Sequence, residues 1–408
     1  MRTVLRVIVT IVVVLAVVGG GTAGYSAWTG RAQGSPQAVD LSTVTISDTL
    51  AGKRILAFGE ATHGNHEFQQ VRLQLSQQLT RRGFQTIAFE ADYASTWAAN
   101  EWVNLRPGRV TTAEEAASVL GFAVYRTRET ADWLAWLRAE NEQRQPDQRI
   151  QLVGIDFQRP DAARLMLDQG VRAVNPAQAD QLAGDLAPYT EDWLERADPA
   201  GLTRCAETAR TWHARLAGQP ALAQAALTIA QMCGAQAAGD GYSRLRDRSM
   251  FDNLNWLLDT TQAQHVLLFA HSGHVEKTGS GFTFDPGMVS LGKAVAERYR
   301  DQYAVIGSDF HRTSVRAGSS RGRQVFEITN RTPLRGIFAQ TSVGYLDFAG
   351  ADEVNRALLG QAQPVGSLGD QVGWLNIWVQ AYHSVSLVPV EAFDALVLVS
   401  AATPSTPL

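Results

Sequence analysis

The stretch RILAFGEATHG, residues 54–64, joins an apolar run to a turn that carries Glu60 and His63. A short apolar run such as residues 54–59 is typical of a buried β-strand. Residues 67–82 follow, and their apolar side chains recur at helical spacing, at Phe68, Val71, Leu75 and Leu79. A strand that passes through a turn into a helix is the repeating unit of α/β proteins, so this stretch predicts that fold class.

Further apolar runs recur along the chain between polar or turn residues. They cover residues 86–89, 150–155, 265–270, 303–307 and 395–399. Residues 131–138 carry two tryptophans and two leucines, and they predict a second helix. Strands that alternate with helices predict an α/β fold, with a largely parallel central sheet and helices on both faces. Residues 160–258 contain no convincing strand, so we expect a helical insertion there.

The composition is that of an ordinary globular protein. The chain has 408 residues, of which 45% are hydrophobic and 19% charged, and these values exclude a disordered, collagen-like or coiled-coil protein. The formal net charge of −4 gives no electrostatic reason to expect a nucleic-acid partner. We expect one folded domain over residues 50–402, with the helical insertion at about 160–258, followed by a short tail, residues 403–408.

The amino terminus has the features of a targeting segment. Arg2 and Arg6 precede an apolar run, residues 7–18, and small residues follow. If it is not cleaved, the segment 7–27 is just long enough to span a bilayer. We therefore expect residues 1–27 to be a signal peptide or a membrane anchor and residues 28–49 to be a linker. The folded part would be exported, either secreted or anchored to the outer face of the cytoplasmic membrane.

Two cysteines, Cys205 and Cys233, are too few for a cysteine-rich metal site or a disulfide scaffold. In an oxidising compartment they could pair with each other. Two buried thiols on neighbouring helices would explain the sequence equally well, so both alternatives stay open.

Titratable residues follow the apolar runs, where the predicted strands end. The first run ends at Glu60 and His63, and the later ones at Glu90 to Asp92, at Asp156, at His271 to His274 and at Asp309 to His311. The carboxyl ends of parallel strands meet at one edge of a sheet, and ligands of open α/β sheets bind there. Buried charges are costly unless they are paired, so acids and histidines that converge usually form a site. The pattern therefore predicts a polar pocket with acid–base groups.

Individual residues suggest roles within such a pocket. His63 lies in a turn where its imidazole can face a cleft, and Glu60 could orient the ring and stabilise its protonated form. His271 and His274 suit either oxyanion stabilisation with proton donation, or metal ligation. Arg72 could grip a substrate carbonyl or hold a carboxylate, although a solvated helix position explains it nearly as well. Asp156 could contact substrate or simply cap a turn.

Several common chemistries lack their motifs in this sequence. There is no G-x-S-x-G nucleophile elbow, neither H-E-x-x-H nor H-x-x-E-H occurs, and no Walker A loop is present. No cysteine lies near the predicted strand ends, which excludes thiol catalysis. Water activated by histidine and carboxylate remains, with or without a metal ion.

Taken together, these blocks resemble the erythromycin esterase family. GEATHGNHEF (59–68), with Arg72 downstream, is similar to the family's G-E-x-x-H-x-x-x-E-F signature. Four more blocks occur in the family's order: FEADY (89–93), GIDFQ (154–158), RDRSMFDN (246–253) and HSGH (271–274). The resemblance extends over roughly residues 50–399.

The resemblance implies an α/β hydrolase, unrelated to the serine enzymes, that opens macrolide lactones with water. It implies that His63 is the general base, that Glu60 orients it, and that the same cleft is lined by Glu90, Arg72, His271 and His274. Two departures concern the substrate. Resistance enzymes of the family commonly have Asn where this chain has Ser272, and they lack an export segment. Exported relatives need not act on antibiotics.

We therefore expect a hydrolase that opens an ester or lactone of a small molecule, a macrolide or another natural product, without a cofactor. In a metal-dependent version, Glu60, His63 and His274 would bind a divalent ion that generates the hydroxide. The alternatives from other classes are a metal-dependent envelope peptidase or amidase on the same scaffold, and a non-catalytic ligand-binding protein.

Overall fold

A computed structural model describes residues 34–282 and 288–408. Its centre is a nine-stranded sheet in the order β1-β8-β11-β6-β2-β5-β3-β4, with β7 paired to β6 outside this path. Every pairing from β11 to β4 is parallel. The strands of this parallel part are β2 (Ile55–Glu60), β3 (Thr86–Asp92), β4 (Gln151–Asp156), β5 (Val266–His271), β6 (Tyr303–Ala317) and β11 (Ala395–Ala402). The predicted α/β fold with a largely parallel sheet is confirmed.

Antiparallel strands extend the sheet on one side. The strand β8 (Val343–Asp347) pairs with β11, and β1 (Val39–Asp40) pairs with β8. The long strand β6 turns back into β7 (Gln324–Thr329), and a separate two-stranded sheet joins β9 (Gln363–Gly366) to β10 (Ser384–Leu387). None of these short strands was predicted, since their sequences contain no continuous apolar run.

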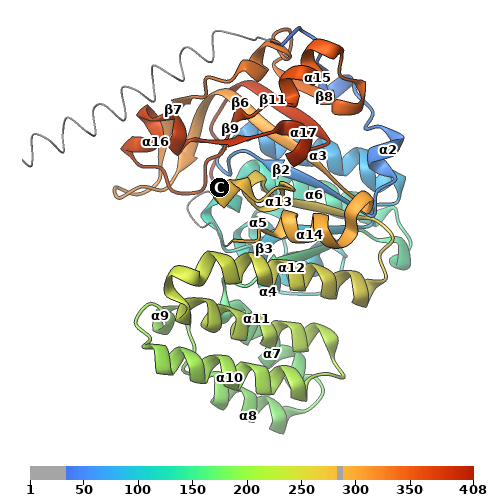
Figure 1. Ribbon diagram of the computed structural model, residues 1–408. Coiled ribbons are helices and arrows are strands. Elements are labelled where there is room, and N and C mark those ends of the chain that lie inside the picture. Colours follow the sequence, from blue (N-terminus) through green and yellow to red (C-terminus); the bar gives the residue numbers. More distant parts are fainter. Residues whose placement is uncertain (1–33, 283–287) are drawn as a thin grey trace, which may run out of the picture.

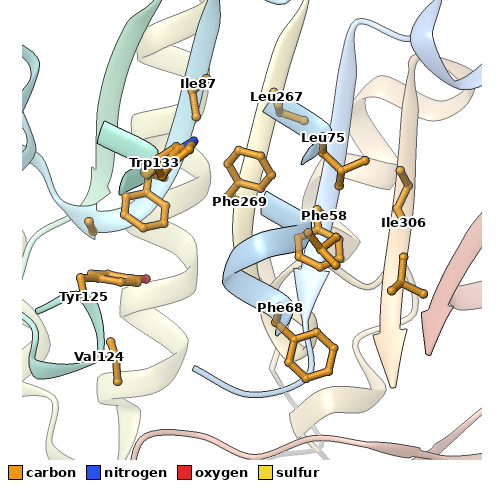
Figure 2. Packing of buried hydrophobic residues seen from close by; sticks show 14 of the residues in the cluster. Phe58, Phe68, Leu75, Ile87, Val124, Tyr125, Trp133, Leu267, Phe269 and Ile306 are labelled. Carbon is orange, nitrogen blue, oxygen red and sulfur yellow. The ribbon is translucent and has the colours of Figure 1, made fainter. Parts of the chain in front are cut away.

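Helices cover both faces of the sheet (Figure 1). One face packs on α3 (His66–Leu79), α4 (Tyr93–Val103), α5 (Ala113–Val119) and α6 (Arg128–Glu142). Figure 2 shows this core, where Phe58, Phe269 and Trp133 meet. The other face packs on α12 (Tyr242–Thr261), α14 (Leu291–Tyr299), α15 (Glu353–Leu359) and α17 (Pro389–Ala392). Because successive strand residues point to opposite faces, strands buried on both sides are continuously apolar.

A helical insertion follows β4, as expected, and forms a layer of its own in Figure 1. Before α12 it comprises α7 (Pro160–Arg172), α8 (Pro176–Leu186), α9 (Glu191–Leu194), α10 (Pro199–Arg215) and α11 (Pro220–Ala237). A separate hydrophobic core, built largely of alanine and leucine, holds these helices together. A disulfide between Cys205 and Cys233 links α10 to α11, so the two cysteines pair in this structure.

The predicted signal peptide or anchor, residues 1–27, lies outside the described residues, as does the first part of the linker. Within residues 34–282 and 288–408, no helix combines the length and hydrophobicity that a membrane span requires.

Candidate functional site

The turn after β2 places His63 against Glu60. The imidazole Nδ1 lies 2.7 Å from Glu60 Oε1, and the carboxylate of Glu60 is buried at the end of the strand. A Cβ atom on Gly64 would overlap the carbonyl oxygen of Arg316, so only glycine allows this close approach of the turn to β6. The turn therefore holds the imidazole and the carboxylate together through local backbone geometry.

The carboxyl-terminal residues fasten the same turn. Ser405 donates its backbone N–H to the carbonyl of Gly64, and His66 donates its own to the carbonyl of Thr403. The carboxylate of Glu67 accepts both the N–H and the hydroxyl of Thr403. Residues 403–408, the predicted short tail, thus lie against the turn that carries His63.

The environment of His63 favours its protonated form. Burial by itself lowers the pKa of the imidazole, but the hydrogen bond and charge of Glu60, with the charges of Glu90 and Asp370, outweigh burial and raise it. The ring of His271 lies 5.0 Å from that of His63 between centroids. His63 is thus a base whose protonated state the site is built to stabilise.

Arg246, on α12, ties together the ends of β3 and β4. Its Nη2 donates to Glu90 Oε1 at 2.7 Å and to Asp156 Oδ2 at 2.6 Å, and its Nε also donates to Asp156 Oδ2 at 3.0 Å. Both carboxylates are buried. Burial raises the pKa of Glu90, but the positive charges of His274, Arg246 and His63 outweigh burial and hold this pKa far below its usual range. Glu90 is therefore a permanent anion between the histidines.

His274 lies on the short helix α13 (Ser272–Val275), which begins directly after β5. Its Nδ1 is 2.8 Å from Asp247 Oδ1, and its Nε2 is 3.3 Å from Glu90 Oε1 and 3.0 Å from Arg246 Nη1. Burial lowers the pKa of His274, but Asp247 and Glu90 outweigh burial and raise it. Asp247 and Glu90 thus favour the imidazolium form of His274, while the positive charge of Arg246 opposes it.

His271, at the end of β5, is held in the opposite state. Its backbone N–H donates to Glu90 Oε2 at 2.7 Å, and its ring Nδ1 accepts the backbone N–H of Gly273 at 3.2 Å. Burial and the positive charge of His63 lower the pKa of His271 to about 3. The ring is therefore neutral at physiological pH, and because Nδ1 accepts, its proton is on Nε2. The backbone of Ala61 interacts with the ring and opposes this shift, but the buried Nε2 makes no hydrogen bond of good geometry within the described residues.

These groups face one pocket of about 450 Å³. Of the residues proposed from sequence, it is lined by His63, Glu90, His271 and His274. Phe122, Val124 and Tyr125 form an apolar wall, and Gln158, Arg246 and Asp370 add polar groups. The remaining site residues proposed from sequence, Glu60, Asp156 and Arg72, lie behind this lining.

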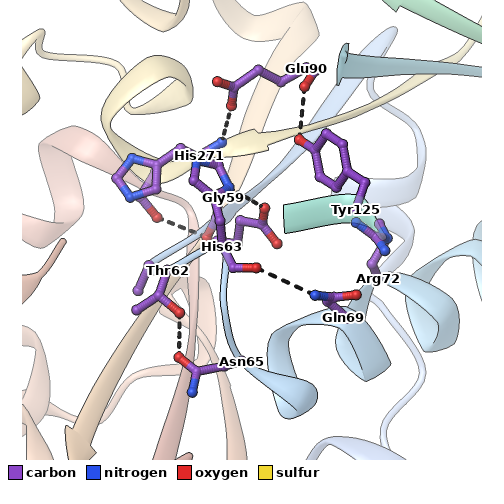
Figure 3. A network of polar contacts seen from close by, with 12 residues as sticks. Gly59, Thr62, His63, Asn65, Gln69, Arg72, Glu90, Tyr125 and His271 are labelled. Atoms are coloured by element: carbon purple, nitrogen blue, oxygen red, sulfur yellow. Dashed lines mark hydrogen bonds and ion pairs between the residues drawn. The ribbon is translucent and has the colours of Figure 1, made fainter. Parts of the chain in front are cut away.

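Arg72 is buried next to the aromatic core rather than exposed on the helix. Its guanidinium lies 4.6 Å from the ring centroid of Trp133 and 5.2 Å from that of Phe89, and Nη2 donates to Thr130 Oγ1 at 3.0 Å. Burial lowers the pKa of Arg72, and the negative charge of Glu60 opposes that shift. Figure 3 shows Arg72 near Tyr125 and Gln69. This cation therefore lies behind Glu60, one layer away from the pocket.

The fifth predicted strand end is wrong. β6 continues to Ala317, because its second half pairs with β7, so Asp309 and His311 lie inside the strand. Asp309 accepts hydrogen bonds from Asn330 and Gly366, and His311 contacts the carbonyl of Asn330. Neither lines the pocket.

The residues missing from the sequence-based site share one property: each is brought in from a distant part of the chain. Arg246 and Asp247 lie in the block RDRSMFDN, which the family resemblance singled out without assigning a role. Tyr125 donates its hydroxyl to the carbonyl of Glu90, and Asp370 approaches from the segment after β9. For Arg246 and Asp247, the adjacent unlike charges at the start of a long helix were a usable signal.

The donor set does not fit a metal ion. Among residues 34–282 and 288–408, no group of three or more His, Cys, Asp or Glu side chains has the arrangement to hold one. Of the three candidate ligands, His63 is engaged by Glu60 and His274 is flanked by the cation Arg246. A guanidinium beside Nε2 takes the position in which a cation would bind.

A parallel sheet with paired histidines and carboxylates at its carboxyl edge, facing one pocket, defines an α/β protein equipped for acid–base chemistry on a small molecule. The sequence pattern of the family described as erythromycin esterase matches residues 79–402, and the chain belongs to this family of hydrolases. The family proposed from the sequence blocks is thereby confirmed.

Individual relatives are distant. The chain is 25% identical over 303 residues to erythromycin esterase type I of Escherichia coli, which covers 64% of this chain and 72% of that protein. It is 26% identical over 140 residues to the putative hydrolase YbfO of Bacillus subtilis, covering 34% of this chain and 30% of that protein.

Solved structures share the fold at low identity. A Bacillus cereus protein superimposes with a TM-score of 0.76 at 19% identity, covering 95% of this chain and 99% of that one. A mutant of the erythromycin esterase EreC, in its open conformation, gives a TM-score of 0.63 at 18% identity, covering 91% and 97%.

Proposed function

We propose that the protein hydrolyses an ester or lactone with a water molecule that His63 activates. The observation that carries this proposal is the pair formed by His63 Nδ1 and Glu60 at 2.7 Å, beside a pocket that His63 lines. With Nδ1 engaged by the carboxylate, Nε2 is the ring nitrogen that takes a proton from water. Glu60 orients the imidazole and stabilises the imidazolium that forms.

The opposite side of the pocket supplies complementary groups. The neutral His271 carries its proton on Nε2 and would donate a hydrogen bond to the oxyanion that forms when hydroxide attacks the carbonyl carbon. The protonated His274, stabilised by Asp247 and Glu90, would donate a proton to the leaving alkoxide. The two histidines at the end of β5 thus divide the roles of hydrogen-bond donor and general acid, because their environments move their pKa values apart.

Arg72 has a supporting role in this proposal. It lies behind Glu60 and does not line the pocket. Its buried positive charge would attract the carboxylate of Glu60, so that Arg72 acts on His63 by positioning Glu60 rather than by contact with substrate.

The substrate would be a natural-product ester, for example a macrolactone. The apolar wall of Phe122, Val124 and Tyr125 suits the carbon skeleton of such a molecule, and Gln158 offers a polar contact. The curated relative in Escherichia coli is an erythromycin esterase, which supports an ester bond as the target.

We also propose that the folded part is exported. Arg2 and Arg6 before the apolar run 7–18 support a targeting segment. The disulfide between Cys205 and Cys233 supports an oxidising compartment, because such bonds are rare in the cytosol.

The proposal is tested by incubating the full chain with a panel of macrolactones and simple esters and following the gain of one water by mass spectrometry. The same assay with strong chelator and a metal analysis of the purified protein tests the metal-dependent version. We expect chelator-insensitive hydrolysis of at least one ester or lactone. Zinc-dependent cleavage of peptides, or tight binding of a ligand that leaves it unchanged, would contradict the proposal and favour a peptidase or a binding protein.

A further inference from the structure

The most exposed aromatic side chains of the described structure gather on one short segment. Trp374 and Trp378, one turn apart on α16 (Trp374–Trp378), are 70% and 78% exposed, and Tyr382 after the helix is 47% exposed. Val325, 42% exposed, lies on β7, against which α16 packs (Figure 1). Single exposed apolar residues are common, but a group of large ones marks a contact surface. We call Trp374, Trp378, Tyr382 and Val325 the aromatic patch.

The chain around the aromatic patch is positively charged. Residues 311–335 and 367–384, which contain β7 and α16, include six arginines and only two acidic residues, Glu327 and Asp370. Their net charge is thus +4, although the whole protein carries −4. Arg312 and Arg321 are exposed, and one of the two acids, Asp370, is paired with Arg323. An anionic partner would complement this region of an otherwise acidic protein.

The described chain begins beside this region. Gly34 contacts Gly336 and Ile337, which directly follow the basic segment that ends at Arg335. At the other end of that short segment, the backbone N–H of Arg331 donates to Gln380, two residues beyond Trp378. Five residues span at most about 18 Å, so the contact of Gly34 and the contact of Gln380 lie within about 18 Å of each other along this segment.

We propose that the aromatic patch and its arginines form a surface that lies on a lipid bilayer with anionic headgroups. Trp and Tyr prefer the interface between headgroups and acyl chains, and arginines add attraction to anionic lipids. The apolar run 7–18, if it enters the bilayer, would hold the protein close to that surface. Asp370 of the pocket precedes Trp374 by four residues, so contact with the bilayer would keep the pocket near the membrane.

The experiment places a fluorescent label on the full chain at Tyr382→Cys, with Val174→Cys as the matched control. Val174 is on the far helical insertion and is 71% exposed, like Trp374 at 70%. The labelled proteins are mixed with vesicles of bromine-labelled phosphatidylcholine, with or without an equal part of phosphatidylglycerol. We expect quenching several-fold greater at position 382 than at 174, increased by phosphatidylglycerol and reduced by salt.

A second variant separates this surface from the amino-terminal segment. Trp374→Ala with Trp378→Ala should abolish most of the quenching at position 382, while the melting temperature stays unchanged because both side chains are exposed. The proposal would be overturned if the label were quenched equally at positions 382 and 174. It would also be overturned if the double variant left the quenching at position 382 unchanged. A dimer in solution that the double variant dissociates would overturn it too, because the patch would then bind a second copy of the chain.

Discussion

The carboxyl edge of the sheet and the helical insertion are stabilised in opposite ways. At the edge, the carboxylates of Glu90 and Asp156 are buried, and both are hydrogen-bonded to the guanidinium of Arg246, which stabilises them there. In the insertion, a core of alanine and leucine side chains and one disulfide hold the helices, and ion pairs such as Arg172 with Asp180 lie at the surface. The edge is therefore sensitive to the loss of any single partner, whereas the insertion should tolerate most single changes.

The two regions meet at α12. This helix packs against the insertion helix α11 and also against the sheet, and it supplies Arg246 and Asp247 to the pocket. The insertion is thus more than a cover, since its last helix neutralises the acids at the sheet edge. The difference between the regions suggests where substitutions will have large effects and where they will not.

The largest effect is expected for His63→Ala. Without its general base, the enzyme should lose about 10²–10⁴-fold in kcat/KM for its ester substrate. His311→Ala is the matched control, because His311 is partly buried near the same edge but does not line the pocket. Equal losses of kcat/KM in the two variants would show that hydrolysis does not depend specifically on His63.

Arg246→Ala should be the most destabilising single change at the edge. It leaves Glu90 and Asp156 buried without their shared cation, which costs about 3–5 kcal/mol in the free energy of unfolding. The control is Arg248→Ala on the same helix, whose side chain is 67% exposed and pairs with Asp252. We expect its effect to stay within about 0.5 kcal/mol in urea unfolding. Similar losses for both would mean that the buried charges are not sensitive to pairing.

Replacing Cys205 and Cys233 together with alanine should affect the insertion alone. The bond closes a loop over a separation of 28 residues, so its loss should cost about 2–4 kcal/mol of stability. Hydrogen exchange should increase in α10 and α11, while kcat/KM at room temperature stays unchanged. A parallel loss of activity would contradict the separation of the two regions.

The parallel strands and the acids and histidines at their ends could be predicted from sequence, because strands buried on both faces appear as apolar runs. The end of β6 could not, because its second half alternates between exposed and buried positions and looks polar. Glu60, His63, Glu90, His271 and His274 were proposed from local patterns, and the structure brings them together. Asp370 depends on long-range folding that no local pattern reveals, whereas Arg246 lies in a recognisable block whose role only the folded structure shows. Arg72 illustrates the same limit, since its burial against Trp133 follows from the packing of α6 on α3.

The most direct test of the account is the pH dependence of kcat/KM for the wild type, Glu60→Gln and Asp247→Asn. His63 must be neutral to accept a proton, so the rate rises with pH through its pKa; without Glu60 this pKa falls, and the acid limb moves to lower pH. His274 must be protonated to donate, so the rate falls above its pKa. Without Asp247 that pKa falls too, and the alkaline limb moves to lower pH.

We expect each variant to move its own limb of the profile and to leave the other limb in place. If both variants moved the same limb, or if neither variant moved a limb, the assignment of His63 as the base and His274 as the acid would be contradicted.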